Sequence, residues 1–181
     1  MKKSVLALAL STGVALTMLA AMPAHAMGSG NSYADFQVGV TYTVYQPTYT
    51  NGLKQMSFKG NAGDASCSAE ESFDARYASG KKRQFTITEG NPICRDIGQG
   101  PTVFTTMIKG AKAVVEAYCP EPAINCSVKD VAKWGGHLSV IFPSGGNGLR
   151  PTQIWIETLK GQAIGANELI KIAQRMQPIN R

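Results

Sequence analysis

After residue 40 the chain alternates short runs of β-branched and aromatic residues with glycine-containing breaks. This pattern predicts antiparallel strands joined by hairpins. Opposed residues of an antiparallel pair lie on the same face of the sheet. The odd or even numbering of the apolar positions therefore restricts which loops can join two strands.

The first predicted hairpin runs from Phe73 to Ile87. Its apolar residues occupy odd positions on both strands, which requires a loop with an odd number of residues. The loop 78–80 meets this requirement, and its glycine suits the left-handed position of a three-residue turn. This arrangement places Phe73 opposite Phe85.

A two-residue loop, 109–110, is predicted to join the second pair of strands. It places Phe104 opposite Val115 and Ile108 opposite Ala111, so that apolar residues share a face. The second loop residue is a glycine, as expected where φ is positive.

The strand 113–117 is then predicted to pair with a strand from Val128 to Trp134. Their apolar residues lie on the same face of the sheet if the residue numbers of each opposed pair add up to an odd number. A turn at Gly135-Gly136-His137 would lead into a strand from Leu138 to Phe142. A last strand is expected from Gln153 to Leu159.

The hydrophobic period changes near the C-terminus. Leu169, Ile172, Ala173 and Met176 recur at the spacing of one helix face, so a helix is predicted from Asn167, its N-cap, to Gln177, before Pro178. The fold class expected is α+β: a curved antiparallel sheet of about seven or eight strands, a meander of hairpins, with a C-terminal amphipathic helix packed on it. We expect one such domain over residues 41–181.

The first 26 residues have the pattern of a secretory signal peptide. Lys2 and Lys3 precede an uncharged apolar stretch, Ser4–Leu19, and the segment ends in Ala24-His25-Ala26. We expect cleavage after Ala26, an N-terminal extension over 27–40, and a secreted or periplasmic mature protein. No transmembrane segment is expected in the mature chain.

Charge adds little to this picture. The formal net charge of the whole chain is +6, and loss of the two signal-peptide lysines lowers it to +4. The one basic run, Lys81-Lys82-Arg83, follows a glycine and is interpreted as a solvated turn, the alternative being a site for an anionic partner. We therefore expect no nucleic-acid partner.

Four cysteines lie in the predicted mature part, and an even number in an exported chain favours two disulfides. Cys119 and Cys126 fall at the end of the register predicted for their strands and would close the proline-containing loop between them. Cys67 and Cys94 are then paired by elimination, beyond the open end of the first hairpin. The cysteine spacings do not suggest a metal site, and no cofactor is expected.

Five aromatic residues are candidates for a binding site. Tyr42, Tyr45 and Tyr49 lie in one extended stretch near a proline and could line an apolar groove with polar edges. Trp134 and Trp155 could form the floor of a pocket. The alternative for all five is that they fill the core or cover the edge of the sheet.

Residues for catalysis are few. His137 could act as a general base, but its place beside two glycines favours a solvent-facing turn. We find no catalytic constellation and expect a protein that is not an enzyme.

The order of these features resembles a bacterial extracytoplasmic domain family of unknown function, found in secreted proteins and in the outer parts of anti-sigma and sporulation proteins. That family is similar to the lipoprotein-carrier fold. The resemblance rests on these segments: Val44–Thr48 with Gly52–Leu53, Phe73–Ile87, Gly110–Val114, Trp134 with Leu138–Val140, and Glu168–Gln174. It implies a concave half-barrel sheet that holds a helix and serves for binding rather than catalysis.

The sequence thus predicts an exported, non-enzymatic binding or sensing module. Its partner is unknown, and the candidates are an apolar or lipid ligand, or a segment of an envelope protein. The alternative is a secreted hydrolase or inhibitor that acts on envelope or host material.

Overall fold

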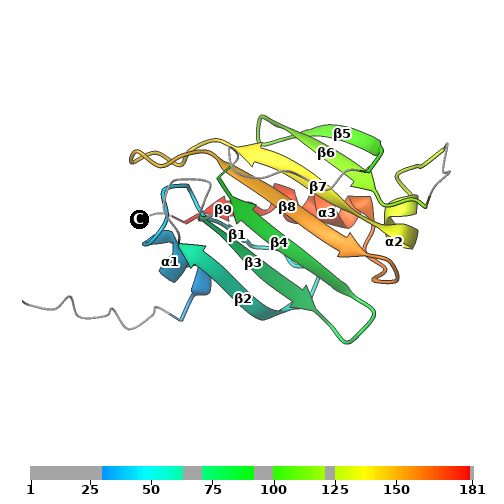
Figure 1. Cartoon of the computed structure of the whole chain (residues 1–181), viewed down its shortest axis with the longest axis horizontal. Coiled ribbons are helices and arrows are strands. Elements are labelled where there is room, and N and C mark those ends of the chain that lie inside the picture. Colours follow the sequence, from blue (N-terminus) through cyan, green and yellow to red (C-terminus); the bar gives the residue numbers. More distant parts are fainter. Residues whose placement is uncertain (1–29, 63–70, 92–99, 121–124, 180–181) are drawn as a thin grey trace, which may run out of the picture.

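The computed structural model describes residues 30–62, 71–91, 100–120 and 125–179. Within these residues the chain forms nine strands and three short helices (Figure 1). The strands are β1 (Tyr45–Pro47), β2 (Lys54–Ala62), β3 (Glu71–Ala78), β4 (Gln84–Gly90), β5 (Thr102–Ile108), β6 (Ala111–Ala117), β7 (Gly135–Phe142), β8 (Thr152–Leu159) and β9 (Met176–Pro178). The helices are α1 (Ser32–Gln37), α2 (Asp130–Trp134) and α3 (Ala166–Gln174).

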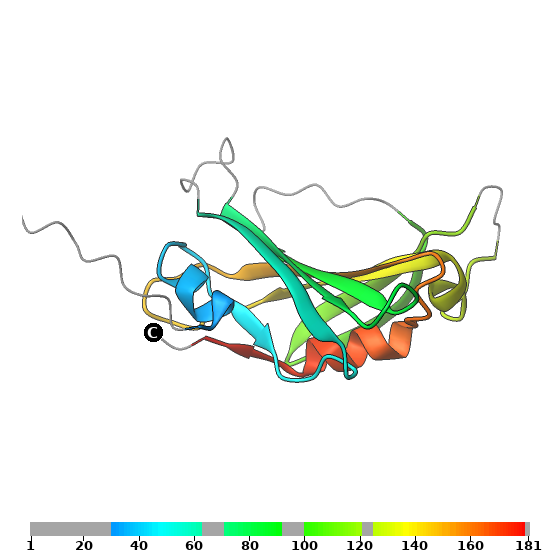
Figure 2. The same ribbon diagram turned by 90° about the horizontal axis from the view of Figure 1, so that it is seen from below.

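Seven strands form one antiparallel sheet in the order β2-β3-β4-β8-β7-β6-β5, and β1 pairs with β9 separately. The predicted α+β class, with an antiparallel sheet and a C-terminal helix, is confirmed. The sheet is not a single meander, because β8 lies between β4 and β7 and joins two runs of hairpins. Figure 2 shows α3 lying along one face of the twisted sheet, which we call the inner face.

The hairpin β3–β4 is confirmed, but its predicted register is wrong. Phe73 lies opposite Glu89 rather than Phe85, and Tyr77 lies opposite Phe85. The loop between the paired residues 78 and 84 is five residues long instead of three, because it includes the basic run 81–83 and keeps it in solvent. The rings of Tyr77 and Phe85 stack at 5.0 Å across the corrected pair.

The hairpin β5–β6 has the predicted register. Phe104 lies opposite Val115, and Ile108 lies opposite Ala111. Lys109 and Gly110 have φ values of +50° and +80°, so both loop residues are left-handed, as a type I′ turn requires.

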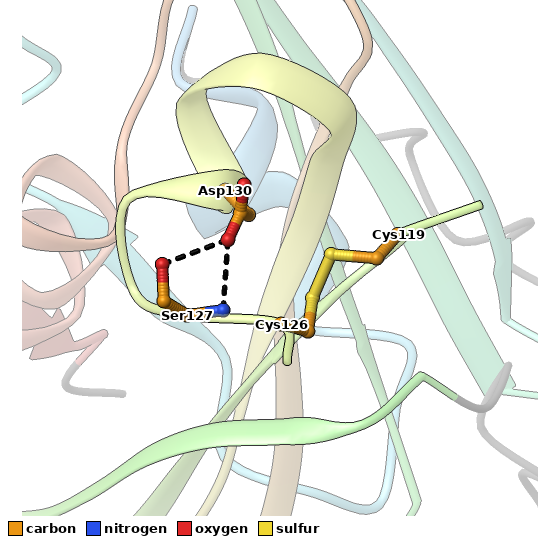
Figure 3. Close-up of a disulfide and its surroundings, with 4 residues drawn as sticks. All are labelled: Cys119, Cys126, Ser127 and Asp130. Atoms are coloured by element: carbon orange, nitrogen blue, oxygen red, sulfur yellow. Dashed lines mark hydrogen bonds between the residues drawn. A yellow bond between two sulfur atoms is a disulfide. The ribbon is translucent and has the colours of Figure 1, made fainter. Parts of the chain in front are cut away.

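The predicted strand 128–134 is wrong, since this segment contains the helix α2. The Asp130 carboxylate accepts hydrogen bonds from the Ser127 N–H (2.8 Å) and hydroxyl (2.7 Å), which favours a helical turn (Figure 3). The strand β6 pairs instead with β7, with Ala113 opposite Val140.

The predicted turn 135–137 is also wrong, because these three residues open β7. Gly135 has a φ of +86° and ends α2, and a Cβ on Gly136 would lie 2.2 Å from the Glu116 carbonyl oxygen. The two glycines thus allow the helix to end and β7 to approach β6 closely.

The strand predicted over 153–159 is confirmed as β8, with one more residue at its start, but it is not the last strand. The C-terminal helix is shorter than predicted: it begins after Gly165, whose N–H donates to the Glu168 carboxylate (3.1 Å). It ends at Gln174, and Met176 belongs to β9, which pairs with β1.

The core lies between the inner face of the sheet and the helices. Leu169, Ile172 and Ala173 of α3 are fully buried. The segment around α1 also contributes, because Tyr33 packs edge-on against Phe73 at 5.2 Å. The segment 31–40, from the N-cap of α1 onward, is therefore part of the packed structure.

We predict that Gly136→Ala lowers the free energy of unfolding by about 3 kcal/mol, because a methyl group there meets backbone that cannot move aside without separating β6 from β7. Urea denaturation measures this loss. The control is Ile141→Ala on the same strand, where the side chain is 49% exposed and a loss below about 1 kcal/mol is expected. Equal losses in the two variants would contradict the packing argument.

Candidate functional site

Tyr42 and Tyr45 lie in the core rather than on a groove, with 0% and 5% of their surface exposed. The Tyr42 hydroxyl donates to the Glu89 carbonyl oxygen (3.3 Å), and the Tyr45 hydroxyl donates to the Pro143 carbonyl oxygen (2.7 Å). Both polar tips therefore have partners within the protein.

Tyr49 and Trp134 are half-buried and each lies against lysine side chains. The Lys171 ammonium lies 4.4 Å from the Tyr49 ring centroid, and Lys133 and Lys160 lie 4.7 and 4.4 Å from that of Trp134. These are cation–π contacts at the surface.

Trp155 lies on the other face of the sheet, which we call the outer face. It alternates along β8 with Ile154 and Ile156, which face the core, and it is 8% exposed. The structure thus distributes the five aromatic candidates over the core, two surface contacts and the outer face, and does not bring them together in one groove.

The disulfide between Cys119 and Cys126 is confirmed, with a Cα–Cα distance of 6.2 Å (Figure 3). Cys67 and Cys94 lie outside the described residues. Among the described histidine, cysteine and acidic side chains, the group whose ligand atoms gather closely enough for a metal ion is Cys119, Cys126 and Asp130. Because the two sulfurs are bonded to each other, they are not the thiolates that a metal ion would require.

The interface between α3 and the sheet is packed with side chains. The α3 residues facing the sheet are fully buried, as are Leu138 and Ile156 beneath them. Two hollows lined entirely by described residues lie elsewhere, around the outer face and the β5–β6 turn.

Glu89 is a carboxyl group buried in the core. It is 0% exposed, and its Oε2 accepts the Tyr45 N–H (2.9 Å) while its Oε1 has no hydrogen-bond partner. Burial raises the pKa of this carboxyl well above its ordinary value, and the Tyr45 N–H opposes that shift. Burial thus favours the protonated, neutral form of Glu89 over the carboxylate.

A ladder of titratable side chains crosses the outer face of three neighbouring strands, β6, β7 and β8. Glu116 on β6, His137 on β7 and Glu157 on β8 are directly opposed residues. The Glu116 carboxylate lies 3.7 Å from His137 Nε2, and the Tyr118 hydroxyl lies 3.1 Å from His137 Nδ1 and 2.7 Å from the Glu157 carboxylate. Glu116 also accepts the Gly100 N–H (2.9 Å).

This ladder corrects the prediction for His137, which lies in a strand and is 3% exposed instead of facing solvent in a turn. Burial lowers the pKa of the imidazole, and the charges of Glu116 and Glu157 oppose that shift. Each polar group of the ladder faces another, so the arrangement holds three strands and the Gly100 backbone together. It leaves no basic nitrogen exposed to a substrate.

The strand β5 lies at one edge of the sheet and pairs only with β6 among the described residues. Its sequence, Thr-Val-Phe-Thr-Thr-Met-Ile, has no charge, glycine or proline and is rich in strand-forming residues. Phe104 is 42% exposed and Met107 is 62% exposed. Such an edge presents unpaired backbone N–H and C=O groups for pairing with another strand.

The other edge strand, β2, is protected in three ways. It has the exposed lysines Lys54 and Lys59, and its register shifts between Gln55 and Ser57. Helix α1 also packs against it, with the ring of Phe36 at 5.7 Å from that of Phe58. These devices obstruct the addition of a strand at β2, and β5 has none of them in the described part.

Two open grooves lie beside the β5–β6 hairpin. One, of about 440 Å³, follows the outer face over β6, β7 and β8. The other, of about 350 Å³, lies at the β5–β6 turn and shares Ala111 and Ile141 with the first. The charged side chains that line the two grooves are Lys109 and Lys112.

No family model, curated protein or solved structure matches this chain. In the described part, none of the helices has the length and apolar character needed to cross a membrane.

Sequence reasoning missed the ladder and the open edge, although both leave signals in the sequence. Placing Glu116, His137 and Glu157 in one row requires the register of β6, β7 and β8, which the predicted turn at 135–137 concealed.

The burial of Glu89 could have been predicted. Glu89 has an odd number, as Phe85 and Ile87 do, so the alternation of the strand places its side chain on their face, toward the core.

We predict that Glu89→Gln removes part of the pH dependence of stability. Above pH 4.5 the unfolded chain releases this proton while the folded protein retains it. The free energy of unfolding should therefore fall by about 1.4 kcal/mol per pH unit until the pKa of the folded state is passed. Urea denaturation at pH 5 to 8 should show a shallower fall for Glu89→Gln than for the unsubstituted protein.

The control for this prediction is Glu71→Gln. The Glu71 carboxylate is buried but accepts hydrogen bonds from the Thr41 N–H (3.1 Å) and hydroxyl (2.5 Å). Its replacement should lower stability, because these two hydrogen bonds are lost or weakened. Parallel pH curves for the unsubstituted protein and Glu89→Gln would show that Glu89 is ionised in the folded state.

We predict that Tyr118→Phe lowers the free energy of unfolding by about 1–3 kcal/mol, because it leaves Glu157 and His137 without their shared hydroxyl. The control is Tyr49→Phe, whose hydroxyl donates only to the nearby Asn51 side chain (3.1 Å) in a half-buried site. Its loss should be below about 0.5 kcal/mol. Thermal denaturation of both variants tests the difference, and a loss for Tyr118→Phe no larger than the control would contradict it.

Proposed function

We propose that this chain is an exported, non-enzymatic binding module that captures an extended segment of an envelope protein along β5. The observation that carries the proposal is the open, uncharged edge of β5, which pairs with β6 alone among the described strands. The signal-peptide pattern of residues 1–26 supports export, and addition of a strand to a sheet edge is a general mode of peptide recognition.

A peptide fits these features better than a lipid does. A lipid or acyl chain would need an enclosed apolar cavity, and the described side chains fill the space between α3 and the sheet. The grooves lined by described residues are open to solvent, and β5 offers backbone hydrogen-bonding groups that an acyl chain cannot use.

A binding role also suits the titratable groups better than catalysis does. The His137 nitrogens face Glu116 and Tyr118, so the imidazole is already engaged on both sides. A general base must reach the proton that it removes, and this imidazole is buried.

The hairpin geometry identifies the backbone groups that would receive the segment. In a two-residue hairpin, the residues on either side of the loop exchange both backbone hydrogen bonds. Ile108 and Ala111 occupy these positions, so Ile108 and Thr106 bond to β6. The alternate residues Thr105 and Met107 then direct their N–H and C=O groups away from the sheet.

We predict that Thr105→Pro weakens the binding of strand-forming peptides about tenfold, because it removes an outward N–H and places a ring at the edge. The probes are terminally blocked heptapeptides that alternate threonine with valine and match the 7-residue length of β5. Titration followed by NMR of the protein amides should show saturable shifts in β5.

The matched control is Met56→Pro on the other edge. Met56 is 63% exposed and lies at the register shift of β2, so its replacement should leave peptide binding unchanged. No binding by the unsubstituted protein, or equal weakening in both variants, would reject the proposal. Sedimentation of a dimer that Thr105→Pro converts to a monomer would instead identify the occupant as a second copy of the chain.

A further inference from the structure

We infer that the segment captured by β5 carries a carboxylate at the end that lies beside the β5–β6 turn. This inference rests on the proposed function and specifies the chemistry of the partner. It follows from how charge is distributed along the β5–β6 hairpin.

The turn end of the hairpin is positive. Lys109 lies in the turn, and Lys112 lies opposite Met107 on the outer face, where it is exposed. Each lines one of the two grooves near the turn and β6, and no acidic side chain lines these grooves. Within the described residues, neither ammonium group has a carboxylate within 4.0 Å.

Lys109 is exposed at the turn, and in the described part of the chain no carboxylate lies within 4.0 Å of its ammonium group. Its Nζ donates to the Met176 carbonyl oxygen, which compensates the ammonium only in part. Burial lowers the pKa of this amine. An anionic group near the turn would supply the counter-ion that this lysine lacks among the described residues.

The opposite end of the hairpin does not favour an anion. Glu116 lies opposite Thr102 there, and its carboxylate is already held by the Gly100 N–H and by His137. A second carboxylate at this end would be repelled by Glu116. The hairpin therefore discriminates between the two ends of an added strand.

The distances allow such a contact. Neighbouring strands lie about 4.8 Å apart, so an added strand would lie about 10 Å from β6. The side chains of Lys112 and of an acidic residue on the same outer face are long enough to meet across that gap.

The same charges argue against a second copy of β5 as the natural occupant. The strand contains no acidic residue, so pairing with its own copy would bring no carboxylate to Lys109 and Lys112. A separate protein segment with an acidic residue satisfies both the backbone edge and the lysines.

The test compares three heptapeptides that alternate threonine with valine: one with glutamate second from its N-terminus, one with glutamate second from its C-terminus, and one with glutamine at both places. Glutamate at one of the two places should tighten binding by roughly two- to fivefold over glutamine, because exposed ion pairs contribute modestly. Glutamate at the other place should not tighten it. The gain should vanish at high salt.

Charge reversal provides the matched control. Lys112→Glu should abolish the gain and favour a peptide with lysine at the same place, whereas Lys59→Glu on β2 should change neither. Equal binding of all three peptides, or an equal gain from glutamate at both places, would overturn the inference and leave the proposed function standing. Failure of every heptapeptide to bind would overturn both.

Discussion

The arrangement of the sheet depends on β8, which pairs with β4 on one side and with β7 on the other. It joins two runs of strands that are consecutive in the sequence, β2 to β4 and β5 to β7. Ile154 and Ile156 of β8 are fully buried beneath the helices, so the strand also forms the centre of the core. Because β8 takes the place beside β4, the strand that follows β4 in the chain is left at the far edge. The open edge of β5 is thus a consequence of the same pairing that closes the core.

Burial on both faces near the middle of β7 and β8 explains the polar ladder. On the inner face Leu138, Ile154 and Ile156 are fully buried, and on the outer face His137, Gln153 and Trp155 are also less than 9% exposed, although Ile141 is 49% exposed. A strand buried on both faces has either apolar residues throughout or polar residues that find partners across the sheet. Opposed pairing brings Glu116, His137 and Glu157 into one row, so each polar group meets another. Their role is to keep three strands in one register.

Rules that use only a short stretch of sequence predicted the features that depend on neighbouring residues, such as the geometry of a tight turn. The two-residue loop 109–110 permits a single register, so β5–β6 was predicted correctly. The loop after β3 could contain three or five residues under the same rule, because alternation of apolar residues determines only whether the number is odd. The basic run at 81–83 decides between them, since a wider loop keeps it out of the strand.

Other features depend on contacts that no short window of sequence contains. Val128, Ala132 and Trp134 fit the alternation of a strand, yet Val131 is the buried residue of α2 and Asp130 stabilises its first turn. Gly135 and Gly136 resemble a turn, although Gly136 is required because β7 approaches the backbone of β6. The insertion of β8 between β4 and β7 joins residues far apart in the chain, and the ladder and the open edge follow from it. The candidate site could therefore not be located before the strand order was known.

The difference between the two edges of the sheet is the strongest reason to assign recognition to β5. At β2 the chain uses lysines, a register shift and a helix, so it has the means to protect an edge. A charge within β5 would obstruct the approach of another backbone, and in the described part the nearby lysines lie outside the strand, Lys109 in the turn and Lys112 on β6. Lysines at these positions leave the backbone of β5 open. They also disfavour the pairing of β5 with a second copy of itself, because that copy has no acidic residue in β5 to offer them. Under the proposed function, an edge that is neutral along its length and positive at one end would select an extended, acidic segment.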